Sequence, residues 1–195
     1  MTVLRVALVG ECMIELQERE GGLLRRGFGG DTLNTAVYLA RLLRKHAAQV
    51  SYATALGDDA LSQSMLEHWQ AEGIDTSLVR RLTGRMPGLY LIQVDARGER
   101  TFSYWRDTSA AKAYFETAPV PLEVDLASID VLYFSGISLA ILPEAGRESL
   151  LAAARSVRAR GARVVFDNNY RHACGPTAVT PAPGMNALLP SVTSP

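Results

Sequence analysis

Short apolar runs alternate along the chain with longer segments in which apolar residues recur every three or four positions. The runs are typical of strands buried on both faces, and the longer segments of amphipathic helices. The pattern predicts strands at residues 3–9, 50–56, 130–135 and 162–167, and helices at 31–46, 58–73 and 143–160. This alternation favours an α/β fold, a parallel sheet with helices on both faces.

Polar residues mark where two of the helices begin. Asp31 or Thr32 is expected to cap the first helix, and Asp58 or Asp59 the second, because short polar side chains accept hydrogen bonds from the first free N–H groups. A glycine follows the second and third helices, as is common at helix ends.

Two pairs of segments break the alternation. Residues 88–94 and 99–105 are rich in Tyr, Ile, Phe and Val and flank a turn at 95–98, which predicts a β-hairpin. Residues 13–16 and 23–28 form a similar pair around two adjacent glycines. We expect an antiparallel β element that projects from the α/β core.

From residue 172 onward the composition changes. Residues 172–195 have almost no charge, many Pro, Ala and Thr, and no periodicity. The predicted organisation is therefore an α/β domain over residues 1–171 and an aberrant, unstructured tail over 172–195.

Charge and cysteine content narrow the function classes. The chain has 195 residues, with 20 basic and 20 acidic side chains, so it offers no basic field for nucleic acid or a membrane surface. We expect a small molecule or a second subunit as partner. The two cysteines form no disulfide framework, which favours the cytoplasm. The three histidines lack metal-ligand spacing, and we expect no metal site within the chain.

The segment Gly29-Gly30-Asp31-Thr32-Leu33-Asn34 is the first candidate site. Paired glycines before a helix let a ligand approach the backbone, and the helix start offers free N–H donors. Asp31 and Asn34 share a helix face and could both bind the hydroxyls of a polyol. The alternative is a glycine turn followed by an Asp cap.

Two further candidates follow predicted parallel strands, whose carboxyl ends are where α/β sheets bind ligands. Glu11 comes directly after the first strand; it is either an acceptor for a sugar hydroxyl or a solvated loop acid. Asp167, Asn169 and Arg171 belong to the polar stretch that follows the strand at 162–167.

The hairpin at 88–105 supplies the last candidates. Tyr104 and Arg106 are two positions apart, on one strand face, and Tyr90 lies on the other strand. A guanidinium beside a phenol can bind a carboxylate, because its fork matches the carboxylate geometry. The alternative is an aromatic face that covers the hairpin, with Arg106 solvated.

Long motifs in a fixed order connect these candidates to a family: GECMIE, GFGGDTLNTAVYLAR, TALGDDALSQSML, DTSLVRRLTGRMPGLYLI, GERTFSYWR, LYFSGISLAIL and VVFDNNYR. From about residue 3 to 171 the sequence resembles the ribokinase-like (PfkB) sugar kinases. GERTFSYWR with FDNNYR favours the members that act on keto-deoxy sugar acids; a fructokinase or ribokinase of the same fold is the alternative.

The resemblance implies a doubly wound sheet and a β-stranded lid, here within about 12–28 and 88–106, that closes over the sugar and often forms a dimer face. It implies transfer of the γ-phosphoryl group of ATP to a primary hydroxyl, with Mg²⁺ and an Asp base. It implies that Tyr90, Tyr104 and Arg106 reach the acid end of the ligand, that Arg171 lies by the transferred phosphate, and that the sugar contacts Gly30, Asp31, Thr32, Leu33 and Asn34.

The sequence also departs from the family. It contains neither the G-A-G-D segment, which holds the family's catalytic Asp, nor the N-x-x-E metal motif. We therefore expect a truncated chain without the ATP site and without turnover, or a non-catalytic fragment. One inserted C after the Arg171 codon lets a back-translation of residues 171–176 read Arg-Pro-Arg-Leu-Trp-Pro, as the family does, so we interpret the tail as frameshifted.

Overall fold

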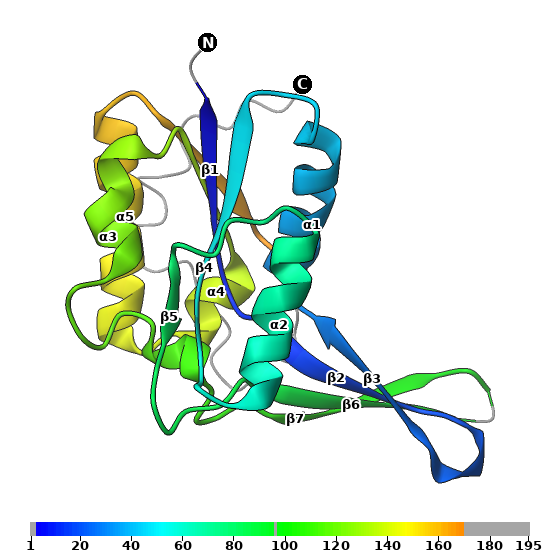
Figure 1. Ribbon diagram of the computed structural model, residues 1–195. Coiled ribbons are helices and arrows are strands. Elements are labelled where there is room, and N and C mark those ends of the chain that lie inside the picture. The colour runs from blue at the N-terminus through cyan, green and yellow to red at the C-terminus, as the bar shows by residue number, and fades with distance from the viewer. Residues whose placement is uncertain (1–2, 96, 170–195) are drawn as a thin grey trace.

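The computed structural model describes residues 3–95 and 97–169, which form a five-stranded parallel sheet and a four-stranded sheet that projects from it (Figure 1). The order in the larger sheet is β5-β4-β1-β8-β9, and all its neighbours are parallel. Its strands are β1 (Leu4–Val9), β4 (Ala48–Leu56), β5 (Val79–Arg81), β8 (Val131–Ser135) and β9 (Arg163–Asp167). The predicted α/β fold is confirmed.

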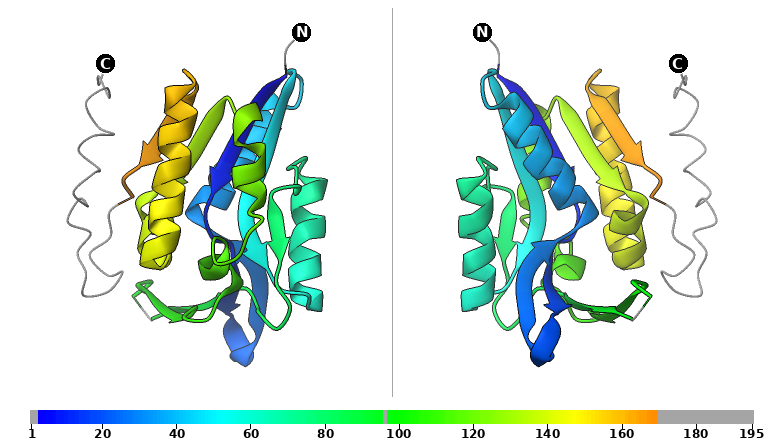
Figure 2. Two further views of the ribbon diagram at one scale, coloured as in Figure 1. Left: turned by 90° about the vertical axis from the view of Figure 1, so that its left-hand side faces the viewer. Right: turned by 90° about the vertical axis from the view of Figure 1, so that its right-hand side faces the viewer.

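Helices cover both faces of this sheet (Figure 2). One face carries α1 (Asp31–Leu43) and α2 (Ala60–Ala71), and the other carries α3 (Pro121–Asp125), α4 (Gly136–Ile141) and α5 (Glu144–Ala159). In β1, Val6 and Leu8 pack into the apolar cluster of α1 and α2, whereas Ala7 and Val9 pack into the cluster of α5. A strand buried on both faces is apolar throughout, which explains the run in the sequence.

The helix starts follow the sequence signals with one correction. Asp59 caps α2, because its Oδ1 accepts hydrogen bonds from two backbone N–H groups of the first turn at 2.9 and 3.0 Å. The prediction that Asp31 or Thr32 caps α1 is wrong. Gly30 holds the N-cap position without a side-chain hydrogen bond, and α1 ends at Leu43 rather than at residue 46.

Several short elements escape the periodic pattern. β5 has three residues, two of them arginines, and it forms by pairing with the last three residues of β4. α4 begins where β8 ends, and Ser135 and Ser138 cap its start reciprocally. Elements of this length contain too few residues to show a period.

The smaller sheet, called the lid below, consists of the two predicted hairpins joined edge to edge. Its strands are β2 (Met13–Glu18), β3 (Leu24–Gly29), β6 (Leu89–Val94) and β7 (Arg100–Trp105), in the order β3-β2-β6-β7. The hairpins are antiparallel, and β2 pairs with β6 in parallel, with Ile14 opposite Leu89. No local pattern in the sequence predicts this parallel pairing. The lid leaves the sheet at the carboxyl end of β1 (Figure 1).

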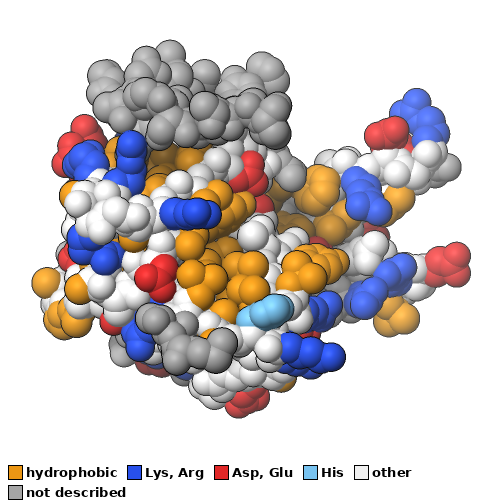
Figure 3. Space-filling model, turned by 90° about the horizontal axis from the view of Figure 1, so that it is seen from above, with side chains coloured by type: hydrophobic (Ala, Val, Ile, Leu, Met, Phe, Trp, Pro, Cys, Tyr) orange, Lys and Arg blue, Asp and Glu red, His pale blue; other side chains and the backbone are white. Residues whose placement is uncertain are grey.

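The amino ends of the parallel strands lie on the opposite side from the lid. Seen from that side, apolar side chains lie among charged ones (Figure 3). Among the described helices, none is long and apolar enough to cross a membrane. Arg171 and the predicted tail at 172–195 lie outside the described residues, so their interpretation stays a prediction.

Candidate functional site

The elements that carry the described candidate residues meet where the lid joins the carboxyl edge of the parallel sheet (Figure 1). β1 pairs with β4 on one side and β8 on the other, so the order of the strands reverses at β1. Open α/β sheets bind ligands outside the carboxyl ends of their strands at such a reversal. The loop after β1, the start of α1, the end of β9 and the root of the lid all lie at this edge.

Two glycines let the start of α1 pass between the lid and the loop after β1. A Cβ atom on Gly29 would lie 2.1 Å from the hydroxyl oxygen of Tyr90, and one on Gly30 would lie 2.3 Å from the carbonyl oxygen of Glu11. No side chain fits at such distances, so both positions require glycine. The first N–H groups of α1 have no partner within the helix, which makes them donors for a ligand.

Of the four residues that follow these glycines, two have buried side chains and two have side chains that are at least partly exposed. Leu33 is buried in the cluster of α1 and α2, and the hydroxyl of Thr32 is hydrogen bonded to that of Tyr52 at 2.9 Å. Thr32 and Leu33 could therefore contact a sugar only through their backbone groups. Asn34 is exposed and Asp31 half-buried, so these are the side chains of the segment that a ligand can reach.

The polar stretch after β9 reaches back to the start of α1. Asn169, whose φ is 33°, donates from Nδ2 to Asp31 Oδ2 at 2.8 Å, and its backbone N–H donates to Asp167 Oδ1 at 3.0 Å. Asp167 also accepts a hydrogen bond from the hydroxyl of Tyr133 at 3.2 Å. Burial, helped by the charge of Asp167, raises the pKa of Tyr133, which keeps this hydroxyl a donor. The structure thus brings three predicted site residues together.

The aromatic candidates face each other across the lid. Tyr90 and Tyr104 lie opposite on β6 and β7, with ring centroids 5.9 Å apart. Tyr90 is buried and donates its hydroxyl to the carboxylate of Glu15, and burial followed by that hydrogen bond raises its pKa. Tyr104 is half-exposed, and the guanidinium of Arg106 lies 6.0 Å from its ring centroid. The predicted association of Arg106 with a phenol is present.

Glu11 and Arg106 form a buried ion pair at the root of the lid. Arg106 donates from Nη2 to Glu11 Oε2, and their side chains are only 17% and 2% exposed, respectively. The alternatives of a solvated loop acid and a solvated arginine are therefore wrong. Glu11 Oε1 and Arg106 Nε are also buried and find no hydrogen-bond partner among the described residues.

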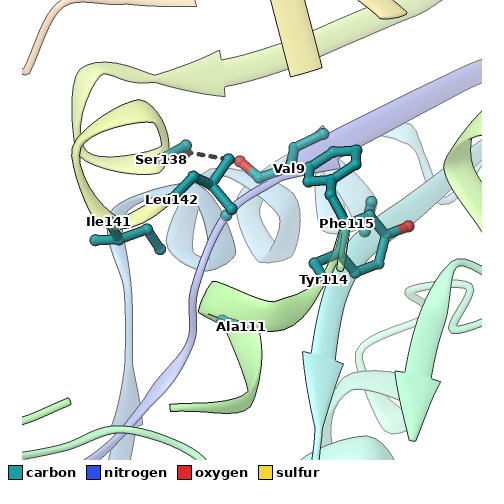
Figure 4. A pocket seen from close by; sticks show the side chains of 9 residues that line it. Val9, Ala111, Tyr114, Phe115, Ser138, Ile141 and Leu142 are labelled. Carbon is teal, nitrogen blue, oxygen red and sulfur yellow. Dashed lines mark hydrogen bonds between the residues drawn. The ribbon is translucent and has the colours of Figure 1, made fainter. Parts of the chain in front are cut away.

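A small cavity lies beside this site, at the carboxyl ends of β1 and β4 (Figure 4). Its walls are mostly apolar, and its polar side chains are already paired. Ser138 donates to the carbonyl oxygen of Val9 at 2.8 Å, and Tyr114 to that of Leu78 at 3.0 Å. None of the predicted site residues lines this cavity, and we assign it no chemistry.

Glu15 and Tyr133 are residues of the site that the sequence analysis misses. Glu15 meets Tyr90 because β2 and β6 pair in parallel, and nothing in the local sequence shows that register. Tyr133 stands in an otherwise apolar strand, VLYFS, and its hydroxyl is the signal that could have been noticed.

The described residues form no cluster of metal ligands. Among residues 3–95 and 97–169, no three or more His, Cys, Asp or Glu side chains gather in a way that could hold a metal ion. Mg²⁺ in kinase sites is held by one or two carboxylates together with substrate phosphates, and no residue of this part of the chain is assigned to it.

Comparisons with known proteins identify the family of the chain. The model of the pfkB family of carbohydrate kinases matches residues 3–193. The 2-dehydro-3-deoxygluconokinase of Dickeya dadantii is 52% identical over 172 residues, which are 88% of this chain and 55% of that protein.

Solved structures show the same fold. A PfkB family carbohydrate kinase from Listeria grayi has a TM-score of 0.74 at 26% identity, covering 86% of this chain and 52% of that one. A fructokinase from Xylella fastidiosa with bound ATP has a TM-score of 0.74 at 23% identity, covering 89% of this chain and 51% of that one. The chain spans about half the length of these proteins, and it belongs to the pfkB family of carbohydrate kinases.

Proposed function

We propose that this chain provides the sugar-acid site of a kinase that phosphorylates 2-dehydro-3-deoxygluconate on its 6-hydroxyl with ATP. The observation that carries the proposal is Arg106, a mostly buried guanidinium at the root of the lid, beside the ring of Tyr104. A cation in such a place suits a ligand that carries a carboxylate, as a sugar acid does. The Dickeya dadantii relative is named for this activity.

The other candidates supply contacts for the rest of the ligand. The backbone N–H groups that start at Gly30 and the side chains of Asp31 and Asn34 face the sugar hydroxyls. Tyr90 and Tyr104 flank the acid end. Arg171 is proposed to lie near the transferred phosphate. An aspartate base is absent from this set, because the sequence lacks the segment that carries it in the family.

One observation favours a second candidate, a fructokinase or ribokinase that takes a neutral sugar. Glu11 already balances the charge of Arg106, so the site has no net charge that demands an anion. However, Glu11 accepts from Nη2, while a guanidinium has five N–H donors, so donors remain for a ligand carboxylate. We therefore prefer the sugar acid.

Calorimetric titration of the 195-residue chain with 2-dehydro-3-deoxygluconate and with D-fructose separates the two candidates. A charge-assisted hydrogen bond contributes about 1.5–3 kcal/mol, so we expect the acid to bind at least about tenfold more tightly. Tighter binding of fructose would assign the site to a neutral sugar.

We further propose that these 195 residues bind the sugar acid without phosphorylating it. The sequence contains neither G-A-G-D nor N-x-x-E, the motifs expected to hold the base and the metal. An ADP-release assay with ATP, Mg²⁺ and the sugar acid tests this directly. Sustained turnover by the purified chain would show that the catalytic groups lie elsewhere in the sequence.

We also propose that two copies of the chain associate through their lids. Trp105 on β7 is 59% exposed and lies on the strand face opposite to that of Tyr104, so it can contact a second copy while Tyr104 faces the ligand. Light scattering should give the mass of a dimer, and Trp105→Ser should shift the equilibrium toward the monomer. A monomer at all concentrations would contradict the proposal.

A further inference from the structure

Glu11 lies where four passages of the chain between the core and the lid converge. It belongs to the passage from β1 to β2. On the passage from β3 to α1, a Cβ on Gly30 would lie 2.3 Å from the carbonyl oxygen of Glu11; on the passage from β5 to β6, a Cβ on Gly88 would lie 2.8 Å from its Oε1. Arg106, which donates to its Oε2, begins the passage that leaves β7. The root of the lid thus closes around one residue, Glu11.

Burial makes this carboxylate dependent on Arg106. The side chain of Glu11 is 2% exposed, and a buried charge requires a counter-charge and hydrogen bonds. Among residues 3–95 and 97–169, Arg106 is the cation that Glu11 pairs with. The dependence is mutual, because Arg106 is held at Nη2 while its Nε has no partner in the described part of the chain.

We propose that Glu11 is a positioning residue, which holds the Arg106 guanidinium at the root of the lid so that its remaining N–H donors are aimed at the ligand carboxylate. Arginine has a long, flexible stem, and a ligand that must order such a side chain loses affinity. Glu11 removes that loss before the ligand arrives. The part of the inference that concerns the ligand rests on the proposed function; the part that concerns Arg106 does not.

Two effects of Glu11 on an anionic ligand oppose each other. Its negative charge weakens the attraction of Arg106 for a second carboxylate, whereas its hydrogen bond orders the guanidinium. The carboxylate of Glu11 accepts a hydrogen bond from Nη2 of Arg106, and the other N–H donors of the guanidinium stay available to the ligand. We therefore expect the ordering effect to outweigh the repulsion. The sign of the change in affinity therefore decides between a positioning residue and a competitor for Arg106.

Glu11→Gln in the full 195-residue chain tests this, because glutamine keeps the shape and removes the charge. We expect 2-dehydro-3-deoxygluconate to bind about threefold to tenfold more weakly, the range set by ordering one long side chain, and D-fructose to bind as before. Glu72→Gln is the matched control, because Glu72 makes a two-point ion pair with Arg41 between α1 and α2. Unchanged or tighter binding of the acid by Glu11→Gln would overturn the proposal.

The Nε–H resonance of Arg106, assigned by its loss in Arg106→Lys, supplies a readout that needs no ligand. In Glu11→Gln this proton should exchange with water several times faster, and in Glu72→Gln at the original rate. If the chain binds neither ligand, the proposed function fails while this spectrum still decides the positioning role: an unchanged exchange rate overturns it.

A second variant covers the case in which Glu11→Gln does not fold. Glu11→Asp keeps the charge and withdraws the carboxylate by one methylene, so the contact with Nη2 is lost or lengthened. The same weaker binding of the acid and the same faster exchange are expected. Wild-type values for both would overturn the proposal.

Discussion

Arg106→Met removes the cation at the root of the lid and keeps an apolar stem of similar length. Glu11, whose side chain is 2% exposed, then loses the group that balances its charge. Removing one partner of a buried ion pair costs about 3–5 kcal/mol. Because the side chain of Arg106 is 17% exposed and water reaches part of it, we expect the lower end, about 3 kcal/mol.

Thermal unfolding at pH 7, followed by circular dichroism, measures this loss. In a chain of this size about 3 kcal/mol lowers Tm by roughly 6–12 °C. The double variant Arg106→Met with Glu11→Gln should recover more than half of the loss, since no charge is left unbalanced. A loss below about 1 kcal/mol in the single variant is what a solvent-screened surface pair gives, and it would show that Glu11 does not depend on Arg106.

Three further predictions concern the start of α1, the cap of α2 and the loss of thermal stability at acid pH. Gly30→Ala places a methyl group 2.3 Å from a carbonyl oxygen, so α1 must shift, and titration should show weaker binding of the sugar acid; unchanged binding would contradict this. Asp59→Ala removes the cap of α2 and should cost about 1 kcal/mol in urea unfolding; no loss would show that the cap is dispensable. For Asp75, burial raises the pKa, but hydrogen bonds from Ser77 and Ser51 lower it further, so the folded pKa lies below the unfolded one. Its stabilisation is present above an unfolded pKa of about 3.9 and lost as pH falls through the folded value; Asp75→Asn should flatten the fall of Tm below about pH 4.

The parallel sheet and its long helices follow from local patterns. β1 is apolar on both faces because helices cover both. Asp59 caps α2, which ends before Gly73, a residue with φ 84°. Such signals lie within a few residues of the element that they define. Four of the five strands of the larger sheet and both hairpins could therefore be predicted from the sequence.

The join between the hairpins and the pairs within the site could not be predicted. The register between β2 and β6 places Glu15 opposite Tyr90, although the two residues are 75 positions apart in the sequence. Glu11 and Arg106 are 95 positions apart, and each by itself is a charged residue of the kind found in solvated loops. Pairings of this kind depend on how the whole fold closes, and local composition does not encode them.

Leu33 shows a conflict that the sequence already contained. It belongs to the apolar face that predicts α1, and it also stands in the segment expected to contact the sugar. A single side chain cannot serve both, and the structure buries it at 3% exposure. The helical period was the stronger guide to where the side chain lies, because a buried leucine stabilises the fold by about 1.5–3 kcal/mol.

The proposed function depends above all on recognition of the ligand carboxylate by Arg106. The most direct test compares wild type with Arg106→Lys, which keeps the charge beside Glu11 and loses the fork that matches a carboxylate. Dissociation constants for 2-dehydro-3-deoxygluconate and D-fructose are measured by calorimetry for both chains. We expect the preference for the acid to fall about tenfold in Arg106→Lys, while the affinity for fructose stays the same. An equal loss for both ligands would show that Arg106 supports the lid and does not read the carboxylate.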